Sequence, residues 1–341
     1  MPLSRGARTL VERRLAHLAA VQQSVTIDAD THPSDPDAYS PELAERLARD
    51  PNYWQGRPIG GEELLRDLDQ AGIDMALAWQ NPAVTVYGAD ENENFERLLA
   101  ANRYIARFAE ANPTRIIPGG WTDPKALGLR NALTLARICV EDFGFPIVKM
   151  NPAQNAYPIT DPMVGETVDA IVALGAIPTF HLGGDSPYTP PDGFAAMAAR
   201  NPAHPIIGVH MGGGGSHFVA GDETYLGARR IGLEHENIFY VLSAKRDTHI
   251  ESALVTYRSA GPSAWRRLAI GSDAPYGRPS WNFGGMRGLL AALSDGAHSN
   301  DPRLRADPGM FDEDAARDVL GRNFAALVVA AYERLLAGSS A

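Results

Sequence analysis

Eight short apolar runs recur along the chain, each bounded by turn-forming residues. They are nearly continuous in hydrophobic character, which is typical of parallel strands that are buried on both faces. The predicted strands cover residues 25–29, 73–79, 116–121, 147–150, 177–181, 206–210, 238–242 and 268–271. From the third strand onward they recur about every 30 residues, which matches the roughly 250 residues of a (β/α)8 barrel divided among eight units.

Helical patterns fill the intervals between these strands. The clearest cover residues 62–69, 94–111, 125–143, 161–175 and 315–336. Gly72 follows the first as a C-cap residue, and Asp161 with Pro162 opens the fourth as N-cap and first helical residue. The alternation of eight strands with helices predicts an α/β fold that is a single (β/α)8 TIM barrel, because a doubly wound sheet usually has fewer strands.

Two segments add to the predicted barrel, which spans residues 25–341. Residues 1–24 place apolar side chains on one helix face, so they are expected to form an N-terminal helical extension that caps the barrel or contacts a partner subunit. The first strand-to-helix connection, residues 33–61, is long, and long loops on the catalytic side of a barrel often act as lids. The candidate lid residues, for which surface packing is the alternative, are Tyr39, Tyr53, Trp54 and Arg57.

Composition narrows the function classes. The 341 residues are 45% hydrophobic and 21% charged, as in an ordinary soluble globular protein. The net charge of −10 comes without a Lys/Arg-rich run, so nucleic acid is not an expected partner. No stretch reaches the ~20 consecutive apolar residues that span a membrane, and residues 1–23 lack the apolar core of a secretory signal. Cys139 is the single cysteine, which excludes an internal disulfide and a cysteine-rich zinc site. Together these features make the cytoplasm the expected location.

Metal-binding side chains stand at the ends of four of the predicted strands. They are Asp30, His32, His181, His210 and Asp273. The C-terminal ends of barrel strands meet at one face, where active sites are built, so these residues should converge although they lie far apart in the chain. Asp30 and His32 are two residues apart in an extended segment and therefore point the same way. This convergence predicts a metal-dependent enzyme.

The motifs around these residues resemble those of the amidohydrolase superfamily. In chain order they are Asp30-Thr-His32, His181, His210-Met-Gly-Gly-Gly-Gly215 and Ile270-Gly-Ser-Asp-Ala-Pro-Tyr276, followed by Leu320-Gly-Arg-Asn-Phe-Ala325, which is similar to the terminal helix of the family. The resemblance covers residues 25–329. The branch it resembles most is the amidohydrolase-related group typified by aminocarboxymuconate-semialdehyde decarboxylase.

The resemblance implies a metal site and an acid–base residue. One divalent metal ion, Zn²⁺ as first choice and Mn²⁺ as second, would be held by Asp30, His32, His181 and Asp273. His210 would be the catalytic acid or base, with Asp273 and Lys149 as further catalytic residues. Asp30 stands where the family commonly has histidine, which resembles its decarboxylases of aromatic and pyrimidine carboxylates and favours harder metals. Several of those decarboxylases have a glutamate shortly after the strand-six histidine, where this chain has Met211 and a glycine run.

Further residues at strand ends are candidates for substrate contacts. They are Arg278, Trp79, Asn81, Trp121 and His217. Arg278 is either a clamp for a carboxylate or a solvated surface residue. Lys149 has three alternative roles: contact with a substrate carboxylate or acid–base catalysis, a structural lysine, or the carboxylated lysine that bridges two metals in binuclear members of the superfamily. Residues 212–215 lack the Lys-Ser/Thr of a phosphate loop, which favours close backbone approach to a ligand or a tight turn.

The favoured function is a metal-dependent, non-oxidative decarboxylase of a small unsaturated or aromatic carboxylate, with His210 as acid/base. The alternative is a hydrolase of an amide, ester, lactone or C–C bond that uses a hydroxide held by the metal, and a hydratase is a third variant. A barrel that only binds is the hypothesis from another class. The expected partners are the small carboxylate, amide or lactone substrate and, from the resemblance, a second copy of the chain in a homodimer.

Overall fold

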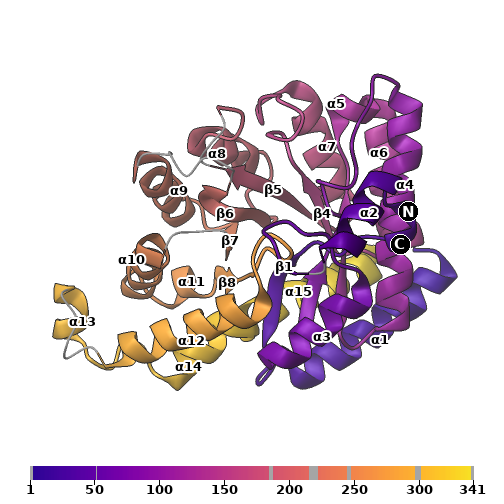
Figure 1. Cartoon of the computed structure of the whole chain (residues 1–341). Coiled ribbons are helices and arrows are strands. Elements are labelled where there is room, and N and C mark those ends of the chain that lie inside the picture. Colours follow the sequence, from indigo (N-terminus) through magenta and orange to yellow (C-terminus); the bar gives the residue numbers. More distant parts are fainter. Residues whose placement is uncertain are drawn as a thin grey trace.

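The eight predicted strands form one parallel sheet that curls into a barrel (Figure 1). The computed structural model describes residues 3–50, 52–183, 187–214, 222–243, 247–295 and 301–338. The strands pair in sequence order, each parallel to the next. Their bounds are β1 Ile27–Thr31, β2 Met75–Ala78, β3 Ile116–Trp121, β4 Ile147–Met150, β5 Ile177–Gly183, β6 Ile206–Gly214, β7 Ile238–Leu242 and β8 Leu268–Ile270. The prediction of a single (β/α)8 barrel is confirmed.

The barrel closes where the chain leaves β1 and β8. Thr31 and Ala274 form a parallel bridge between the two segments. The Asp273 amide donates to the Asp30 carbonyl over 2.9 Å, and the His32 amide donates to the Ala274 carbonyl over 2.6 Å. These backbone bonds bring the two predicted metal-binding segments side by side before any side chain is considered.

Helices cover the outside of the barrel (Figure 1). After β1 to β8 they include α3 Gly61–Ala71, α4 Glu91–Ala111, α7 Pro162–Ala173, α8 Pro191–Arg200, α9 Asp222–Glu234, α10 Asp247–Ser259, α11 Pro262–Trp265, α12 Pro279–Ser294 and α13 Pro302–Ala306. The start of α7 follows the sequence prediction, because the Asp161 side chain accepts from the Met163 amide and Pro162 takes the first helical position. Buried apolar side chains fill the barrel and the layer between strands and helices.

Two segments precede α3. Ser4 is the N-cap of helix α1 (Arg5–Val21), and its hydroxyl accepts from the Ala7 amide. Helix α1 packs against the C-terminal helix α15 (Asn323–Gly338). The long connection after β1 is present, and it contains the short turn η1 (Pro36–Ala38) and helix α2 (Pro41–Arg49). Ser40 caps α2 by accepting from the Leu43 amide over 3.2 Å.

Two helices that the sequence predicts as continuous are interrupted. Residues 125–143 divide at Gly128, with φ 72°, into α5 (Pro124–Leu127), α6 (Leu129–Arg137) and the π-helical turn η2 (Ile138–Asp142). The positive φ of Gly128 separates α5 from α6, and a side chain at this position would overlap the Glu91 carboxylate of α4. Residues 315–336 form α14 (Glu313–Arg317), the π-helical turn η4 (Asp318–Arg322) and α15.

Gly321 lets η4 approach the start of β1, and this generates a stability prediction. A Cβ at Gly321 would overlap the carbonyl oxygen of Val25. Gly321→Ala should lower the free energy of unfolding by about 1–3 kcal/mol, because backbone must move to relieve the overlap. The control is Gly6→Ala in α1, where a Cβ meets no atom of the described residues within 4 Å. Denaturant titration that shows Gly321→Ala to be as stable as Gly6→Ala would contradict this close approach.

Candidate metal centre

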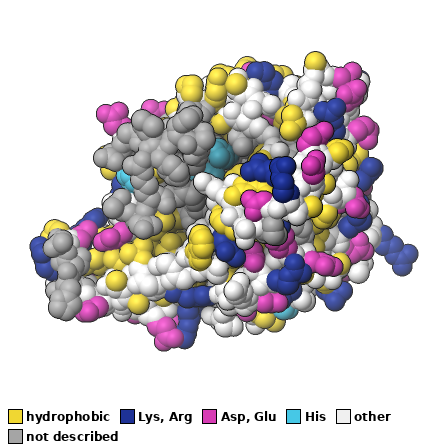
Figure 2. Space-filling view, viewed as in Figure 1, with side chains coloured by type: hydrophobic (Ala, Val, Ile, Leu, Met, Phe, Trp, Pro, Cys, Tyr) yellow, Lys and Arg dark blue, Asp and Glu magenta, His cyan; other side chains and the backbone are white. Residues whose placement is uncertain are grey.

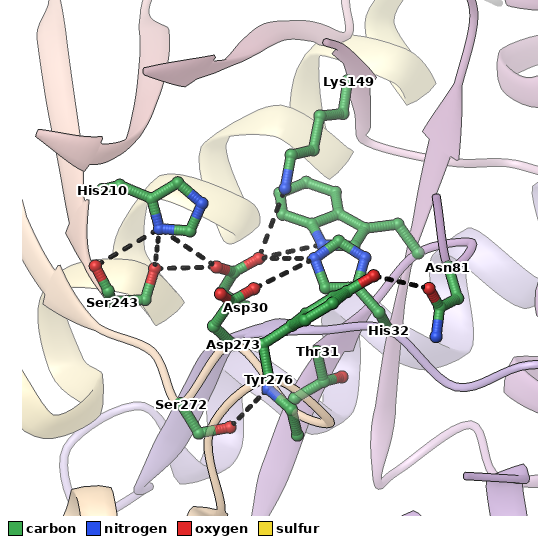
Figure 3. Close-up of polar contacts among 12 residues, drawn as sticks. Asp30, Thr31, His32, Asn81, Lys149, His210, Ser243, Ser272, Asp273 and Tyr276 are labelled. Carbon is green, nitrogen blue, oxygen red and sulfur yellow. Dashed lines mark hydrogen bonds and ion pairs between the residues drawn. The ribbon is translucent and has the colours of Figure 1, made fainter. Parts of the chain in front are cut away.

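Three predicted ligands converge at the mouth of the barrel (Figure 3). Asp30, His32 and Asp273 each place one ligand atom within 4.8 Å of the others, and all three residues are buried. Asp30 lies in β1 and His32 directly follows that strand. Because the two residues are two positions apart in an extended segment, both side chains point inward. Asp273 follows β8 with φ 59°, a left-handed conformation that is uncommon for a residue with a side chain.

The ring of His32 is oriented by the backbone. Its Nδ1 lies 2.8 Å from the Gln80 carbonyl oxygen and donates to it. Nε2 is thereby left unprotonated when the ring is neutral, and it lies 3.4 Å from Asp30 Oδ1 and 3.5 Å from Asp273 Oδ1. A histidine held by a carbonyl at one nitrogen and turned to a cluster of carboxylates with the other has the geometry of a metal ligand.

Asp30 is completely buried and surrounded by donors. Its Oδ1 accepts from Trp79 Nε1 over 3.0 Å and lies 3.4 Å from Lys149 Nζ. Its Oδ2 accepts from the Ser243 hydroxyl over 2.7 Å. Burial alone would raise the pKa of Asp30, but the positive charge of Lys149, followed by His32 and His210, holds the pKa well below its usual value. The carboxylate is therefore ionised and fixed in orientation.

A second buried carboxyl group lies behind Asp30. Asp28 Oδ1 accepts from the Ser272 amide over 2.8 Å and from the Asp30 amide over 3.3 Å. Burial raises the pKa of Asp28 to about 7, against the lowering effect of the bonds from Ser272. Asp28 thus ties the segment after β8 to β1 without adding a ligand to the cluster.

Lys149 lies between two tryptophans. Its side chain is 1% exposed. Nζ lies 4.1 Å from the centroid of the Trp79 ring and 5.1 Å from that of Trp121. Burial lowers the pKa of Lys149, while Asp30 and Asp273 oppose that shift. The ammonium therefore contacts two indole faces and one carboxylate, an arrangement that combines cation–π attraction with an ion pair.

His210 is connected to Asp30 through Ser243. His210 Nδ1 lies 2.8 Å from the Ser243 hydroxyl oxygen and 3.2 Å from the Ser243 carbonyl oxygen. One proton arrangement satisfies these contacts: Nδ1–H donates to Ser243, and the Ser243 hydroxyl donates to Asp30. Burial lowers the pKa of His210, so the ring is neutral near pH 7 and its Nε2 is free to accept a proton.

His181 lies beside His210 rather than within the three-residue cluster. The two rings meet edge to face with centroids 4.6 Å apart. Burial lowers the pKa of His181 well below its usual value, and His210 and Lys149 lower it further. A neutral imidazole is the form that binds a metal, so this shift agrees with a ligand role. The role of His181 as a fourth ligand stays a prediction.

The predicted substrate residues have different surroundings. Trp79 and Trp121 are fully buried around Lys149. Asn81 Oδ1 accepts from the Tyr276 hydroxyl over 2.9 Å, at the edge of the cluster. Arg278 lies over the rings of Tyr53 and Trp281, with 5.1 Å to each centroid. His217 lies outside the described residues.

Sequence reasoning did not single out Ser243, and it named Trp79 and Lys149 without their contacts to Asp30. Ser243 is the first residue after β7, so its position at a strand end was the available signal. Tyr276, which packs edge to face against His32 with ring centroids 6.0 Å apart, ends the motif of residues 270–276, and the motif gives no sign of this contact. His32 is oriented by a backbone carbonyl, that of Gln80, so the type of side chain at position 80 does not predict this contact.

The motif order is matched by a family model. The amidohydrolase model covers residues 27–323, which is most of the chain. The chain belongs to the amidohydrolase family. Its predicted assignment to the metal-dependent enzymes of this superfamily is therefore confirmed. No curated protein matches the sequence.

Solved structures of low identity have the same fold. An uncharacterised TIM-barrel protein from Bordetella bronchiseptica is 15% identical with a TM-score of 0.59, covering 93% of this chain and 99% of that one. A dihydroxybenzoic acid decarboxylase from Polaromonas sp. JS666, with bound manganese and the inhibitor 2-nitroresorcinol, is 15% identical with a TM-score of 0.60, covering 89% and 96%. A 5-carboxyvanillate decarboxylase from Sphingomonas paucimobilis is 16% identical with a TM-score of 0.53, covering 86% and 98%. At this identity the likeness shows the fold alone.

The donor set fits a divalent metal ion. Two carboxylates and one imidazole with a free Nε2 surround a common point, and oxygen-rich sets of this kind suit Mn²⁺ as well as Zn²⁺.

Within the described residues, no helix combines the length and apolar character needed to cross a membrane. The homodimer and the cytoplasmic location stay predictions from the sequence.

The Ser243 bridge generates a prediction about metal affinity. Ser243→Ala removes the donor to Asp30 Oδ2 and the acceptor for His210 Nδ1. Affinity for Mn²⁺ should fall about 10–100-fold, as is typical when a residue that orients a ligand is lost. Ser243→Thr keeps the hydroxyl and should stay near the parent. Titration of the metal-free protein against a fluorescent chelator measures both, and equal affinity of the Ala variant and the parent would show that the bridge does not orient Asp30.

Proposed function

We propose that this protein is a metal-dependent, non-oxidative decarboxylase of an aromatic carboxylate with a neighbouring ring oxygen. The observation that carries the proposal is the buried Asp30–His32–Asp273 cluster linked through Ser243 to His210. It combines a place for a divalent cation with a residue that moves a proton. The fold shared with benzoate decarboxylases supports the choice of reaction within the family.

Different residues would hold the metal ion and transfer the proton. Asp30, His32 and Asp273 would hold the metal ion, with His181 as the further candidate. When bound, the ion would supply a Lewis acid that polarises the substrate oxygens and stabilises negative charge beside the scissile bond. We favour Mn²⁺ because two of the three clustered donors are carboxylates. Asp30 and His32 are almost fully buried, and burial strengthens the charge interactions that they make.

His210 is the acid in this scheme. Its Nδ1 is fixed by Ser243, so Nε2 is the position that exchanges protons. Nε2–H of the charged ring would deliver its proton to the ring carbon that bears the carboxylate. The bond from that carbon to the carboxylate then breaks, its electron pair returns to the ring, and CO₂ leaves. Because burial lowers the pKa of His210, the ring is neutral before the reaction; it would take up this proton from solvent in each turnover and give it up readily.

Lys149 is a positioning residue in this proposal. Its ammonium is enclosed by Trp79, Trp121 and Asp30, and it lies 3.4 Å from Asp30 Oδ1. Enclosure by two indole faces leaves the amine turned to Asp30 rather than to substrate. We therefore assign Lys149 to fixing Asp30, in place of a bridging role between two metals.

The reaction itself is tested with 2,6-dihydroxybenzoate, the ligand of one structural neighbour. Protein loaded with Mn²⁺ should bind one equivalent and release CO₂ from this compound or a related hydroxybenzoate, because the cluster anchors the carboxylate and adjacent oxygen. Chelator-treated protein and Asp273→Ala should lose both metal and CO₂ release. Metal-loaded protein that cleaves amides or lactones but releases no CO₂ from hydroxybenzoates would favour the hydrolase alternative instead.

Lys149→Met separates the positioning role from a bridging one. Removing the ammonium leaves the buried Asp30 carboxylate without its charge partner, so the metal-free protein should lose about 3–5 kcal/mol of stability. One equivalent of Mn²⁺ should still bind, at least as tightly as in the parent, because a cation beside the ligands is gone. The control is Lys125→Met, an exposed lysine that contacts the carbonyls of Asn155 and Ala156. If parent protein binds two equivalents and Lys149→Met binds fewer, Lys149 is a bridging ligand.

A further inference from the structure

A cavity of about 480 Å³ begins at the metal cluster and extends away from it. Asp273, Ser243 and Tyr276 form the end nearest the cluster. The cavity then passes the ends of β7 and β8 and reaches α12. Its apolar lining there comes from Leu242, Ile250, Ile270, Trp281, Met286 and Leu289. Gln55 and Asn282 are its polar lining residues, and the Asn282 side-chain amide donates to the Ser272 carbonyl. The volume falls in the range of small-molecule sites, roughly 300–1,000 Å³.

The wall formed by α12 contains glycines that packing does not explain. Gly284, Gly285 and Gly288 lie inside this helix, although glycine is one of the weakest helix formers. A Cβ at any of the three meets no atom of the described residues within 4 Å. Gly285 lines the cavity, and the other two are not among its described lining residues. The missing side chain at Gly285 therefore keeps the cavity open rather than admitting another part of the described fold.

The rim of the cavity joins α12 to the long connection after β1. Trp281 is 64% exposed, and Tyr53 meets its ring edge to face with centroids 5.8 Å apart. The Tyr53 hydroxyl donates to the Tyr276 carbonyl over 3.3 Å, which holds the connection against the segment after β8. Figure 2 shows hydrophobic side chains gathered on this face in the region of α12. An apolar group that enters the cavity would contact aromatic surface at its mouth.

We propose that this cavity binds an uncharged, apolar substituent on the substrate, such as an aryl or branched alkyl group. The inference rests on the proposed function, since it places the carboxylate at the metal cluster and the substituent toward α12. The described lining residues include six apolar side chains and no Lys or Arg, so this lining favours an uncharged arm over a second carboxylate. The substrate class is thus a hydroxybenzoate with one carboxylate and an apolar arm, and Gly285 sets the room for that arm.

Calorimetric titration of the full-length, Mn²⁺-loaded protein tests this. The probes are 2-hydroxybenzoate, its 4-phenyl and 5-phenyl derivatives, and 4-phenylphenol, which has no carboxylate. The variants are Gly285→Leu, which fills the cavity, and Gly288→Leu, which makes the same change to the helix outside it. At least one phenyl derivative should bind the parent and Gly288→Leu about 10-fold or more tighter than 2-hydroxybenzoate does. In Gly285→Leu that gain should shrink to under about 3-fold.

The inference is overturned if neither phenyl group increases the affinity, or if Gly285→Leu retains the increase. The proposed function is unaffected by either result. If none of the carboxylates binds, the proposed function fails. Binding of 4-phenylphenol then tests whether the cavity is an apolar site. Binding of 4-phenylphenol to the parent and Gly288→Leu that is lost in Gly285→Leu supports an apolar site. Absent binding, or binding that is equal in the three proteins, overturns it.

Discussion

The ionised carboxylate of Asp30, completely buried at the mouth of the barrel, is the constraint on which the site depends. An isolated charge in such a place would be strongly destabilising, so its surroundings must compensate. Three residues do so: Trp79 directly after β2, Lys149 in β4 and Ser243 directly after β7. Each of these residues then acquires a fixed position of its own. Ser243 fixes His210, and Lys149 fills the space between two tryptophans.

The same constraint links the site to the closure of the barrel. Asp30 and Asp273 are joined by a backbone hydrogen bond as well as by their shared neighbour His32. Asp273 and His210 both adopt left-handed backbone conformations, with φ of 59° and 76°. Such conformations cost of the order of 1–3 kcal/mol each and persist where surrounding structure enforces them. Here they aim side chains from β8 and β6 at the cluster, so strain at the strand ends is part of how the site is assembled.

The parts predictable from sequence are those that leave a local pattern. Buried parallel strands leave continuous apolar runs, and ligands at strand ends leave Asp and His directly after those runs, as Asp30, His32 and Asp273 do. The rest depends on contacts between distant segments. Lys149 meets Trp121 because β3 and β4 pair in that register, and neither residue signals it alone. The role of Ser243 becomes visible only when the end of β7 is placed beside Asp30, and the need for glycine at 321 becomes visible only when η4 is placed against Val25.

The account rests on one divalent ion at the Asp30–His32–Asp273 cluster, with Lys149 outside its ligand set. Anomalous diffraction from crystals of the protein grown with Mn²⁺, recorded on both sides of the manganese absorption edge, tests this directly. One peak within coordination distance of Asp30, His32 and Asp273, with Lys149 Nζ still between Trp79 and Trp121, is the predicted result. No peak at the cluster, or two peaks bridged by a modified Lys149, would contradict it.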